Sequence, residues 1–327
     1  MSDSAFASVA EAAAAVAVAA VVDLLLGDPP NRLHPVAWMG RALGVGRRAL
    51  CHGGRVRLLL GGAFVTLAIT SVAAAAGAAL AALATRLGPA APLVEGAALS
   101  LLLSPRGLVA AARAVAAPLA GGGLDAARSA LALHLVSRPT ATLGPDEVAS
   151  AAIESVAENL TDAFVAPLCF YLVFGLAGAA AYRAVNTADA MLGYRDGALE
   201  WFGKVAARLD DALNFVPARL AALGLVVGAA VGGEDVRGAW RGLRRDGGRT
   251  ASPNAGLTMA AMAGALGLTL AKRDAYRLGD GRPATAGDVA RAVWVFAWAA
   301  GLTLVALLLL DSLALFLRDA SYALGII

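Results

Sequence analysis

The sequence predicts an all-α protein, a polytopic membrane helical bundle with re-entrant or half-helices around a polar cleft that faces the cytoplasm. Two observations predict this class. Of the 327 residues, 59% are hydrophobic and only 16% are charged, whereas soluble domains carry about 25% charged residues. Several apolar stretches are also about 18 to 25 residues long, which is enough to cross the hydrocarbon layer of a bilayer. The composition therefore argues against an ordinary soluble enzyme and for an integral membrane protein.

Four stretches are expected to cross the membrane as helices. The first ends at Gly27-Asp28-Pro29-Pro30, because proline lacks the backbone N–H that a helix needs. The third is long enough only if it continues past Arg106. The four expected spans lie near residues 6–26, 58–83, 93–119 and 293–317. Between the third and fourth spans, residues 124–134 read as an amphipathic helix outside the membrane.

Three further apolar segments are shorter and are expected to be short or re-entrant. They lie near residues 163–181, 218–231 and 255–270. The polar segments around them are all rich in arginine, so complete crossings would place basic loops on both sides of the membrane, against the positive-inside rule. Re-entrant segments are tolerated where their backbone is buried in protein or lines a cavity. Residues 1–327 are thus expected to form a single membrane domain in contact with the lipid bilayer.

The segment from Asn31 to Arg57 sets the expected orientation. It contains six arginines and no acidic residue, which predicts that it is cytoplasmic. The net charge of the chain is only +3, and its basic residues are not interleaved with aromatic residues. Binding to nucleic acid is therefore not expected.

An acidic cluster precedes the apolar segment 163–181. On a helix, Glu154, Glu158 and Asp162 share one face within an arc of about 80°, and Asn159 adjoins them. Like charges this close repel one another, and the repulsion is relieved by a divalent cation, by an arginine partner or by protonation of one member. Oxygen ligands suit Mg²⁺, which in proteins usually accompanies a phosphate substrate. The alternative is a solvated helix face without a ligand.

A second cluster mixes arginine, asparagine and aspartate. Arg183, Asn186 and Asp189 follow one another at three-residue steps, and two pairs of the same kind, Arg208 with Asp211 and Asp210 with Asn214, come later. Guanidinium forks bind phosphate and carboxylates bind its metal, so this pattern predicts a nucleotide or phosphoryl site. Salt bridges that hold the bundle together are the alternative.

Two smaller motifs complete the candidate site. Ser252-Pro253-Asn254 reads as a helix start with Ser252 as N-cap, and free N–H groups at such a start form a weak anion site. Capping alone is the alternative. His34 follows Asp28 by six residues on a turn bounded by prolines. This arrangement makes His34 a stronger functional candidate than an isolated histidine, whose usual role is structural.

Taken in order, the motifs resemble one family. The strings are D-L-L-L-G-D-P-P-N-R-L-H-P-V, E-S-V-A-E-N-L-T-D-A-F-V-A-P-L, Y-R-A-V-N-T-A-D-A-M-L-G-Y-R, F-G-K-V-A-A-R-L-D-D-A-L-N-F-V-P-A-R-L and S-P-N-A-G. Each string is unspecific by itself, but five in the same order are similar to the cobalamin biosynthesis family called CbiB or CobD, the adenosylcobinamide-phosphate synthases.

The resemblance implies an enzyme of the inner cell membrane that joins a carboxyl group of adenosylcobyric acid to the amine of (R)-1-amino-2-propanol O-phosphate, with ATP as cosubstrate and Mg²⁺ as cofactor. It is also compatible with a homo-oligomer or with association with neighbouring late-pathway enzymes. The simplest route for such a ligation passes through an acyl phosphate.

The expected roles within this reaction are divided among the motif residues. Asp28, His34, Glu154 and Glu158 are the catalytic candidates, with Asp28 or His34 as the base. The metal is assigned to members of the set Glu154, Glu158, Asp162 and Asp189. Substrate and phosphate groups are assigned to Asn159, Arg183, Asn186, Arg195, Lys204, Arg208, Asp210, Asp211, Asn214, Arg219, Ser252 and Asn254.

Two other functions remain open on the residues alone. A membrane phosphotransferase or lipid-pyrophosphate phosphatase would use the same acidic and arginine residues, although the D-G-x-x-A-R core of the CDP-alcohol phosphotransferases is absent from the sequence. A secondary transporter would also carry half-helices and buried acids, but the sequence shows no internal repeat.

Overall fold

A computed structural model describes residues 3–323, and these form two compact units. The first unit comprises residues 3–104, 166–213 and 305–323, and the second comprises residues 105–165 and 214–304. Helix α14, Ala286–Ala323, begins in the second unit and ends in the first. The expectation of a single membrane domain stays a prediction.

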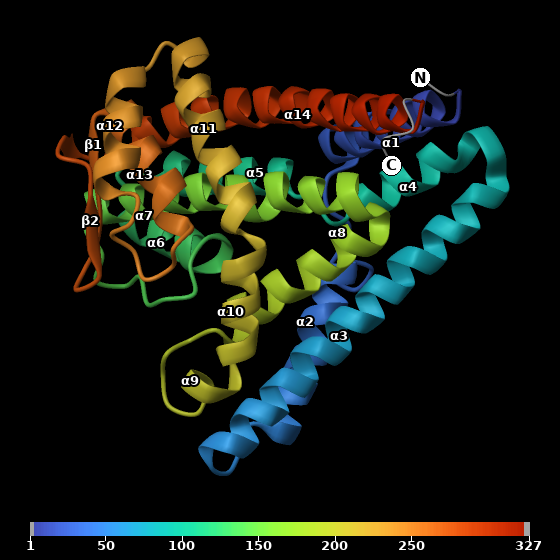
Figure 1. Cartoon of the computed structure of the whole chain (residues 1–327). Coiled ribbons are helices and arrows are strands. Elements are labelled where there is room, and N and C mark those ends of the chain that lie inside the picture. Colours follow the sequence, from blue (N-terminus) through green and yellow to red (C-terminus); the bar gives the residue numbers. More distant parts are fainter. Residues whose placement is uncertain (1–2, 324–327) are drawn as a thin grey trace. The chain divides into compact units, whose positions relative to one another are not determined.

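The first unit is built from helices alone. They are α1 Asp3–Leu26, α2 Pro35–Leu50, α3 Arg55–Ala84, the 3₁₀ helix η1 Thr85–Ala90, α4 Ala91–Ser100, α8 Ala166–Leu192, α9 Leu199–Phe202 and α10 Lys204–Leu213. Helix α3 packs against α2, α8, α9 and α10, while α1 packs against α4. In Figure 1, α2 runs beside the first half of α3, and α8 crosses beside its second half.

Small residues let these helices approach closely. A Cβ atom added at Gly62 of α3 would lie 1.7 Å from the carbonyl oxygen of Phe202 in α9. A Cβ atom at Gly77 would lie 2.6 Å from the carbonyl oxygen of Leu176 in α8. Next to that contact, Gly175 has a φ of 63°, a conformation that favours glycine, and it breaks the regular geometry of α8.

The second unit surrounds a short buried helix. Its elements are α5 Pro105–Ala120, α6 Leu124–His134, α7 Pro145–Leu160, the π-helical turn η2 Thr161–Val165, α11 Phe215–Gly232, α12 Val236–Asp246, α13 Ala255–Leu266, β1 Leu268–Lys272, β2 Tyr276–Leu278, β3 Arg282–Pro283 and the first part of α14. Helix α13 contacts α7, α11 and α12, and residues 259–263 are almost completely buried. At 1.5 Å per residue its 12 residues span only about 18 Å, too short to cross a membrane.

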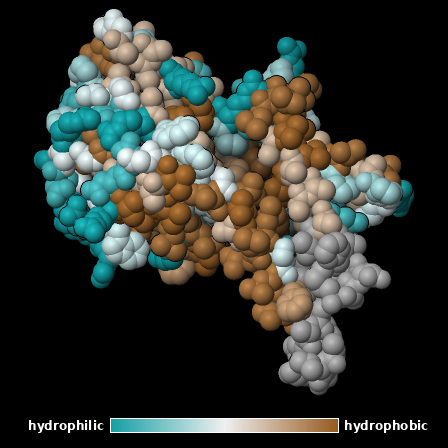
Figure 2. Space-filling model, turned by 90° about the horizontal axis from the view of Figure 1, so that it is seen from above, coloured by the Kyte–Doolittle hydropathy of each residue, from teal (hydrophilic) through white to brown (hydrophobic). Residues whose placement is uncertain are grey.

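Within the part of the chain that the structure describes, four helical segments are long and apolar enough to cross a membrane. They are Arg55–Ala120, Pro145–Leu192, Phe215–Gly232 and Ala286–Ala314. Large hydrophobic side chains are exposed along them, among them Phe64, Val227 and Leu309, and Figure 2 shows broad hydrophobic areas next to hydrophilic ones. The predicted class, an all-α polytopic membrane bundle, is confirmed; which side of the membrane the loops face stays a prediction.

The structure differs from the expected elements in two places. The expected span 93–119 is divided, because α4 ends at Ser100 and α5 begins at Pro105; proline lacks an N–H and disfavours helical geometry at the residue before it. The expected apolar segment 255–270 is also divided. Its helix ends at Gly267, which has a φ of 66°, and Leu268 begins the central strand of a small sheet.

That sheet has the order β2-β1-β3, with β1 and β2 antiparallel and β1 and β3 parallel. The predicted amphipathic helix 124–134 is present as α6. The segment expected near 163–181 is longer than predicted, since α7, η2 and α8 follow one another without an intervening loop.

Candidate functional site

A small polar pocket lies in the first unit where α8 ends and α10 begins. Its volume is about 40 Å³. Three predicted phosphate-binding cations line it, Arg195, Lys204 and Arg208, and Glu200 and Asp211 are the acidic residues of its wall. The structure therefore brings together residues that the sequence placed in one motif group.

Two glycines shape this pocket. A Cβ atom at Gly203 would lie 1.8 Å from the carbonyl oxygen of Leu192, so the start of α10 can approach the end of α8 only because this residue is glycine. A Cβ atom at Gly193 would lie 2.0 Å from a carboxylate oxygen of Asp189. Asp189 thus lies against the backbone that leads to Arg195.

The cations of the pocket differ in their partners. Lys204 forms an ion pair with Glu200 at 2.5 Å and lies over the ring of Trp201, so part of its charge is already neutralised. Arg195 and Arg208 are exposed, and neither forms an ion pair with a carboxylate in the part of the chain that the structure describes. These two guanidinium groups are the better candidates to bind a phosphate.

A chain of polar contacts joins α8 to α10. Nη1 of Arg183 donates to Oδ1 of Asn186 at 3.2 Å, and Nδ2 of Asn186 donates to Oδ1 of Asp210 at 3.2 Å. Asn186 consequently bridges an arginine and an aspartate on neighbouring helices. The predicted face of Arg183 and Asn186 exists, and the structure adds Asp210 to it.

Asp28 and His34 also meet in the first unit. Nδ1 of His34 accepts a hydrogen bond from the N–H of Val36 at 3.2 Å, which caps α2. Its Nε2 lies 3.4 Å from Oδ1 of Asp28, and Ser104 donates to the other oxygen at 2.8 Å. Burial raises the pKa of Asp28, but the hydrogen bonds from His34 and Ser104 and the positive charge of Arg183 lower it overall. Asp28 is therefore ionised, and the proton of a neutral His34 lies on Nε2.

In the second unit, Glu154 is a buried anion with several partners. Its side chain accepts from the hydroxyl groups of Ser150 at 2.7 Å and Tyr276 at 2.9 Å, and Arg138 lies 3.9 Å away. Burial, followed by the charge of Glu154, raises the pKa of Tyr276, so its hydroxyl stays protonated and donates. Ser150 also accepts from the N–H of Ala271 in β1. Glu154 thus ties α7 to the small sheet.

The other predicted acidic residues lie further along the same segment. Glu158 is in the last turn of α7, and Asp162 is in the π turn η2, a rare conformation that is often found at functional sites. Among residues 3–323, no three acidic, histidine or cysteine side chains gather as a metal cluster would. The amide of Asn159 donates back to the carbonyl oxygen of Ser155.

At the Ser252-Pro253-Asn254 motif, Arg219 and Asn254 lie close together, but Ser252 is not the N-cap that the sequence predicted. Nη1 of Arg219 lies 3.4 Å from Oδ1 of Asn254. Helix α13 begins at Ala255 with Asn254 as its N-cap, so the prediction that Ser252 caps the helix is wrong. The Ser252 hydroxyl accepts from the N–H of Asn254, which closes a turn before the helix starts. Asn214 is buried just before α11.

Comparison with known proteins identifies the family. The family model described as CobD/Cbib protein matches residues 16–315. The chain belongs to the CobD/Cbib protein family. It is 41% identical over 263 residues to a protein of Dehalococcoides mccartyi named cobalamin biosynthesis protein CobD, covering 80% of this chain and 85% of the relative. It is 42% identical over 264 residues, with the same coverage, to a probable cobalamin biosynthesis protein CobD of Methanothermobacter thermautotrophicus. No solved structure matches the chain.

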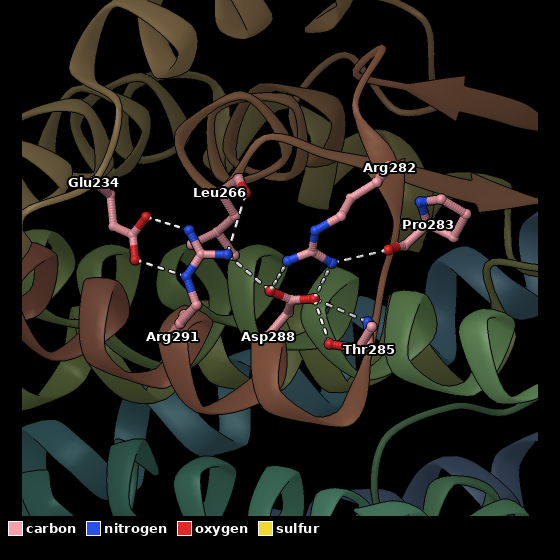
Figure 3. Close-up of polar contacts among 7 residues, drawn as sticks. All are labelled: Glu234, Leu266, Arg282, Pro283, Thr285, Asp288 and Arg291. Atoms are coloured by element: carbon pink, nitrogen blue, oxygen red, sulfur yellow. Dashed lines mark hydrogen bonds and ion pairs between the residues drawn. The ribbon is translucent and has the colours of Figure 1, made fainter.

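The family resemblance did not point to one charged cluster of the second unit. Asp288 accepts from both guanidinium nitrogens of Arg282 at 2.7 Å and from Nη1 of Arg291 at 2.8 Å. Arg291 also donates to both carboxylate oxygens of Glu234. Figure 3 shows these four side chains, Glu234, Arg291, Asp288 and Arg282, in a row. The cluster fastens the start of α14 to β3 and to the turn between α11 and α12.

A sequence signal for this cluster exists. The string T-A-G-D before an apolar run is a capping box, and Asp288 accepts from both the N–H and the hydroxyl of Thr285. Tyr276 was missed for another reason: nothing in its local sequence connects it to Glu154, which is 122 positions away in the chain.

Proposed function

We propose that this CobD/Cbib family member is a membrane enzyme of cobalamin biosynthesis that joins adenosylcobyric acid to (R)-1-amino-2-propanol O-phosphate in an ATP-dependent amide ligation. Family membership over most of the chain and the names of the relatives support the pathway. The observation that carries the phosphate chemistry is the polar pocket in which Arg195 and Arg208 form no ion pair with a carboxylate among the described residues.

The arginines suit two phosphate-bearing substrates. A guanidinium group offers a planar fork of donors that matches phosphate oxygens, and it keeps its charge at any physiological pH. Lys204, already paired with Glu200, supplies positive charge beside the pocket rather than a free donor fork. We assign Arg195 and Arg208 to a phosphate of ATP or of the aminopropanol substrate, and Arg183 with Asn186 to an adjoining polar contact on α8.

Asp28 suits the amine end of the second substrate. Its lowered pKa keeps it ionised near neutral pH, and an ionised carboxylate that is 33% exposed can attract an ammonium group. His34 has its Nδ1 engaged with the N–H of Val36 and its proton directed at Asp28, so it has no free lone pair for a base. We therefore place Asp28 as the group that receives the amine and His34 as its positioning residue.

The fit of Mg²⁺ depends on the remaining carboxylates. Glu154 is satisfied by two hydroxyl groups and faces Arg138, so it is a poor metal ligand. Mg²⁺ is commonly held by one or two carboxylates, and Glu158 and Asp162, both in the second unit, remain the carboxylates that would hold it there. When bound, the ion would supply positive charge that stabilises a phosphate group.

The proposed ligation proceeds in two steps. A carboxylate oxygen of adenosylcobyric acid attacks the γ-phosphorus of ATP, and the bond to the β-γ bridging oxygen breaks to release ADP. The ammonium group loses a proton to solvent, its nitrogen then attacks the acyl carbon, and inorganic phosphate leaves with the former carboxylate oxygen while the nitrogen releases a second proton. Arginine forks favour both steps because they stabilise charge that develops on phosphate oxygens.

Purified protein in detergent tests the proposal. Incubated with adenosylcobyric acid, aminopropanol phosphate, ATP and Mg²⁺, it is expected to form adenosylcobinamide phosphate and one ADP per product. Omission of any one substrate should abolish the product. Product without ATP, or phosphate release from a lipid pyrophosphate in place of amide formation, would overturn the proposal and favour the phosphatase alternative.

A further inference from the structure

The first unit contains a second, larger cavity that the proposed ligation does not use. Its volume is about 610 Å³, within the size range of ligand pockets. Helices α2, α3, α4 and α8 form it, and nearly all of its lining is apolar. Representative lining residues are Leu33, Trp38, Met39, Val72, Ala76 and Leu102. A ligand that fills it must therefore be largely hydrocarbon.

Two arginines lie in or just before α2, the helix that contributes Trp38 to this cavity. The indole N–H of Trp38 donates to the carbonyl oxygen of Arg32 at 2.8 Å, and Nη1 of Arg41 donates to the carbonyl oxygen of Asn31 at 3.3 Å. The first bond places the backbone of Arg32 beside Trp38, which lines the cavity, and the second holds the Arg41 guanidinium against the turn that precedes α2. Both arginines are exposed, and neither forms an ion pair within the described residues.

The segment that surrounds Arg32 and Arg41 is also positively charged. From Asn31 to Arg57 the chain has six arginines and no acid. Helix α2 turns Pro35, Trp38, Met39 and Ala42 toward the cavity, while Arg41 and Arg48, seven residues apart, share another face. Trp38 is 50% exposed. A helix with an apolar face, a tryptophan and arginines on its polar face is typical of the membrane interface.

We propose that this cavity binds one anionic phospholipid, with an acyl chain in the cavity and the phosphate at Arg41 and Arg32. Charge complementarity selects an anionic headgroup, because the segment offers positive charge and no acidic residue. The apolar lining selects a lipid over a soluble phosphate, since a soluble anion would gain nothing from the cavity. Val72, which lines the cavity, is also 70% exposed on a candidate membrane helix, so lipid can enter from the bilayer.

The test compares lipids bound to the full chain in detergent by native mass spectrometry. Phosphatidylglycerol is expected to bind more tightly than phosphatidylcholine with the same acyl chains. Arg41→Gln should weaken phosphatidylglycerol binding about fivefold, as expected for one basic residue at an anionic headgroup. Arg48→Gln is the matched control, because it removes the same charge from the same helix beyond the cavity lining, and it should bind nearly as the parent does.

A second pair of variants tests the acyl chain. Ala76→Phe places a ring in the cavity and should lower the binding of both lipids, whereas Ala75→Phe, the neighbouring exposed residue outside the lining, should not. Glycerol 3-phosphate, the headgroup chemistry without chains, should fail to compete. Equal affinity for the two lipids, equal effects of the Arg41 and Arg48 variants, or displacement of the lipid by adenosylcobyric acid would each overturn the proposal. None of these outcomes depends on ligase activity.

Discussion

The hydroxyl of Tyr276 in β2 donates a hydrogen bond to Oε2 of Glu154 in α7 at 2.9 Å. This contact, with Ser150 and Arg138 on the same carboxylate, changes the expected role of Glu154. A carboxylate that is 5% exposed and already has three partners holds the small sheet against α7 and is a poor metal ligand. The acidic cluster of the sequence therefore divides into a structural member and two candidate ligands, Glu158 and Asp162.

Paired substitutions separate these roles. Tyr276→Phe should lower the free energy of unfolding by about 1 to 2 kcal/mol, because Glu154 loses a buried hydrogen bond, with activity per folded molecule retained. Glu158→Gln should reduce kcat/KM about tenfold or more without loss of stability. Denaturation in detergent and the ligation assay measure the two effects. Loss of activity in Tyr276→Phe with full stability, or a fully active Glu158→Gln, would contradict this division.

Lysine substitution tests the phosphate assignment of the arginines. Arg208→Lys is expected to raise KM for ATP or for aminopropanol phosphate about tenfold, because a point charge on a flexible stem does not reproduce the guanidinium fork. Arg183→Lys should have a similar effect, with expression and thermal stability near those of the parent. Arg128→Lys, whose partner Asp125 is exposed on α6, is the control and should leave kinetics unchanged. Unchanged kinetics in the first two variants would indicate bundle-holding charges.

Gly203 offers a test of how the pocket is built. Gly203→Ala should displace the start of α10 from the end of α8, because its Cβ atom would meet the carbonyl oxygen of Leu192. KM for the phosphate substrates should rise and thermal stability should fall together. Gly248→Ala, where a Cβ atom meets nothing within 4 Å, is the control. An unaffected Gly203→Ala enzyme would show that this close approach is not needed.

The lowered pKa of Asp246 predicts how the stability of the fold depends on pH. Burial raises its pKa, but hydrogen bonds from Arg245 and from the N–H of Gly279, with the charge of Arg249, lower it below the ordinary value. Because the pKa of Asp246 is lower in the folded state, its ionised form stabilises the fold above the unfolded pKa of about 4. This stabilisation is lost as the pH falls from about 4 through the lower pKa of the folded state. Asp246 is fully buried.

The corresponding experiment compares Asp246→Asn with the parent by thermal unfolding from pH 7 to pH 3. At pH 7 the variant should be less stable by about 1 to 2 kcal/mol, because the buried side chain loses hydrogen bonds to its charged form from partly exposed arginines and from the N–H of Gly279. The difference should shrink as the pH falls below about 4. A difference that stays constant over this range would show that the carboxylate charge is not what stabilises the fold.

The elements that the sequence predicted well are those with strong local signals. Helix α6 follows from its amphipathic spacing, and the end of α1 follows from Gly27 and the two prolines. The break before α5 had a signal in Pro105, but the apolar residues on both sides of it suggested one span. The strand β1 was hidden because Leu268 and Leu270 continue the apolar run of α13, and only Gly267 marks the end of the helix.

The proximity of candidate residues in space was predictable where they are close in the chain. Arg195, Lys204 and Arg208 fall within fourteen positions and line one pocket. Contacts between distant positions, such as Tyr276 with Glu154 or Asp28 with Ser104, have no local pattern. Such contacts are set by the packing of helices and strands, so one sequence cannot reveal them.

The central claim, an ATP-dependent ligation through an acyl phosphate, is tested most directly by isotope transfer. Adenosylcobyric acid with ¹⁸O in its reacting carboxylate is incubated with the purified protein, aminopropanol phosphate and ATP, and the phosphate products are analysed by mass spectrometry. The account predicts one ¹⁸O atom in inorganic phosphate for each amide formed. Label in AMP, or amide formation with no label in any phosphate product, would contradict it.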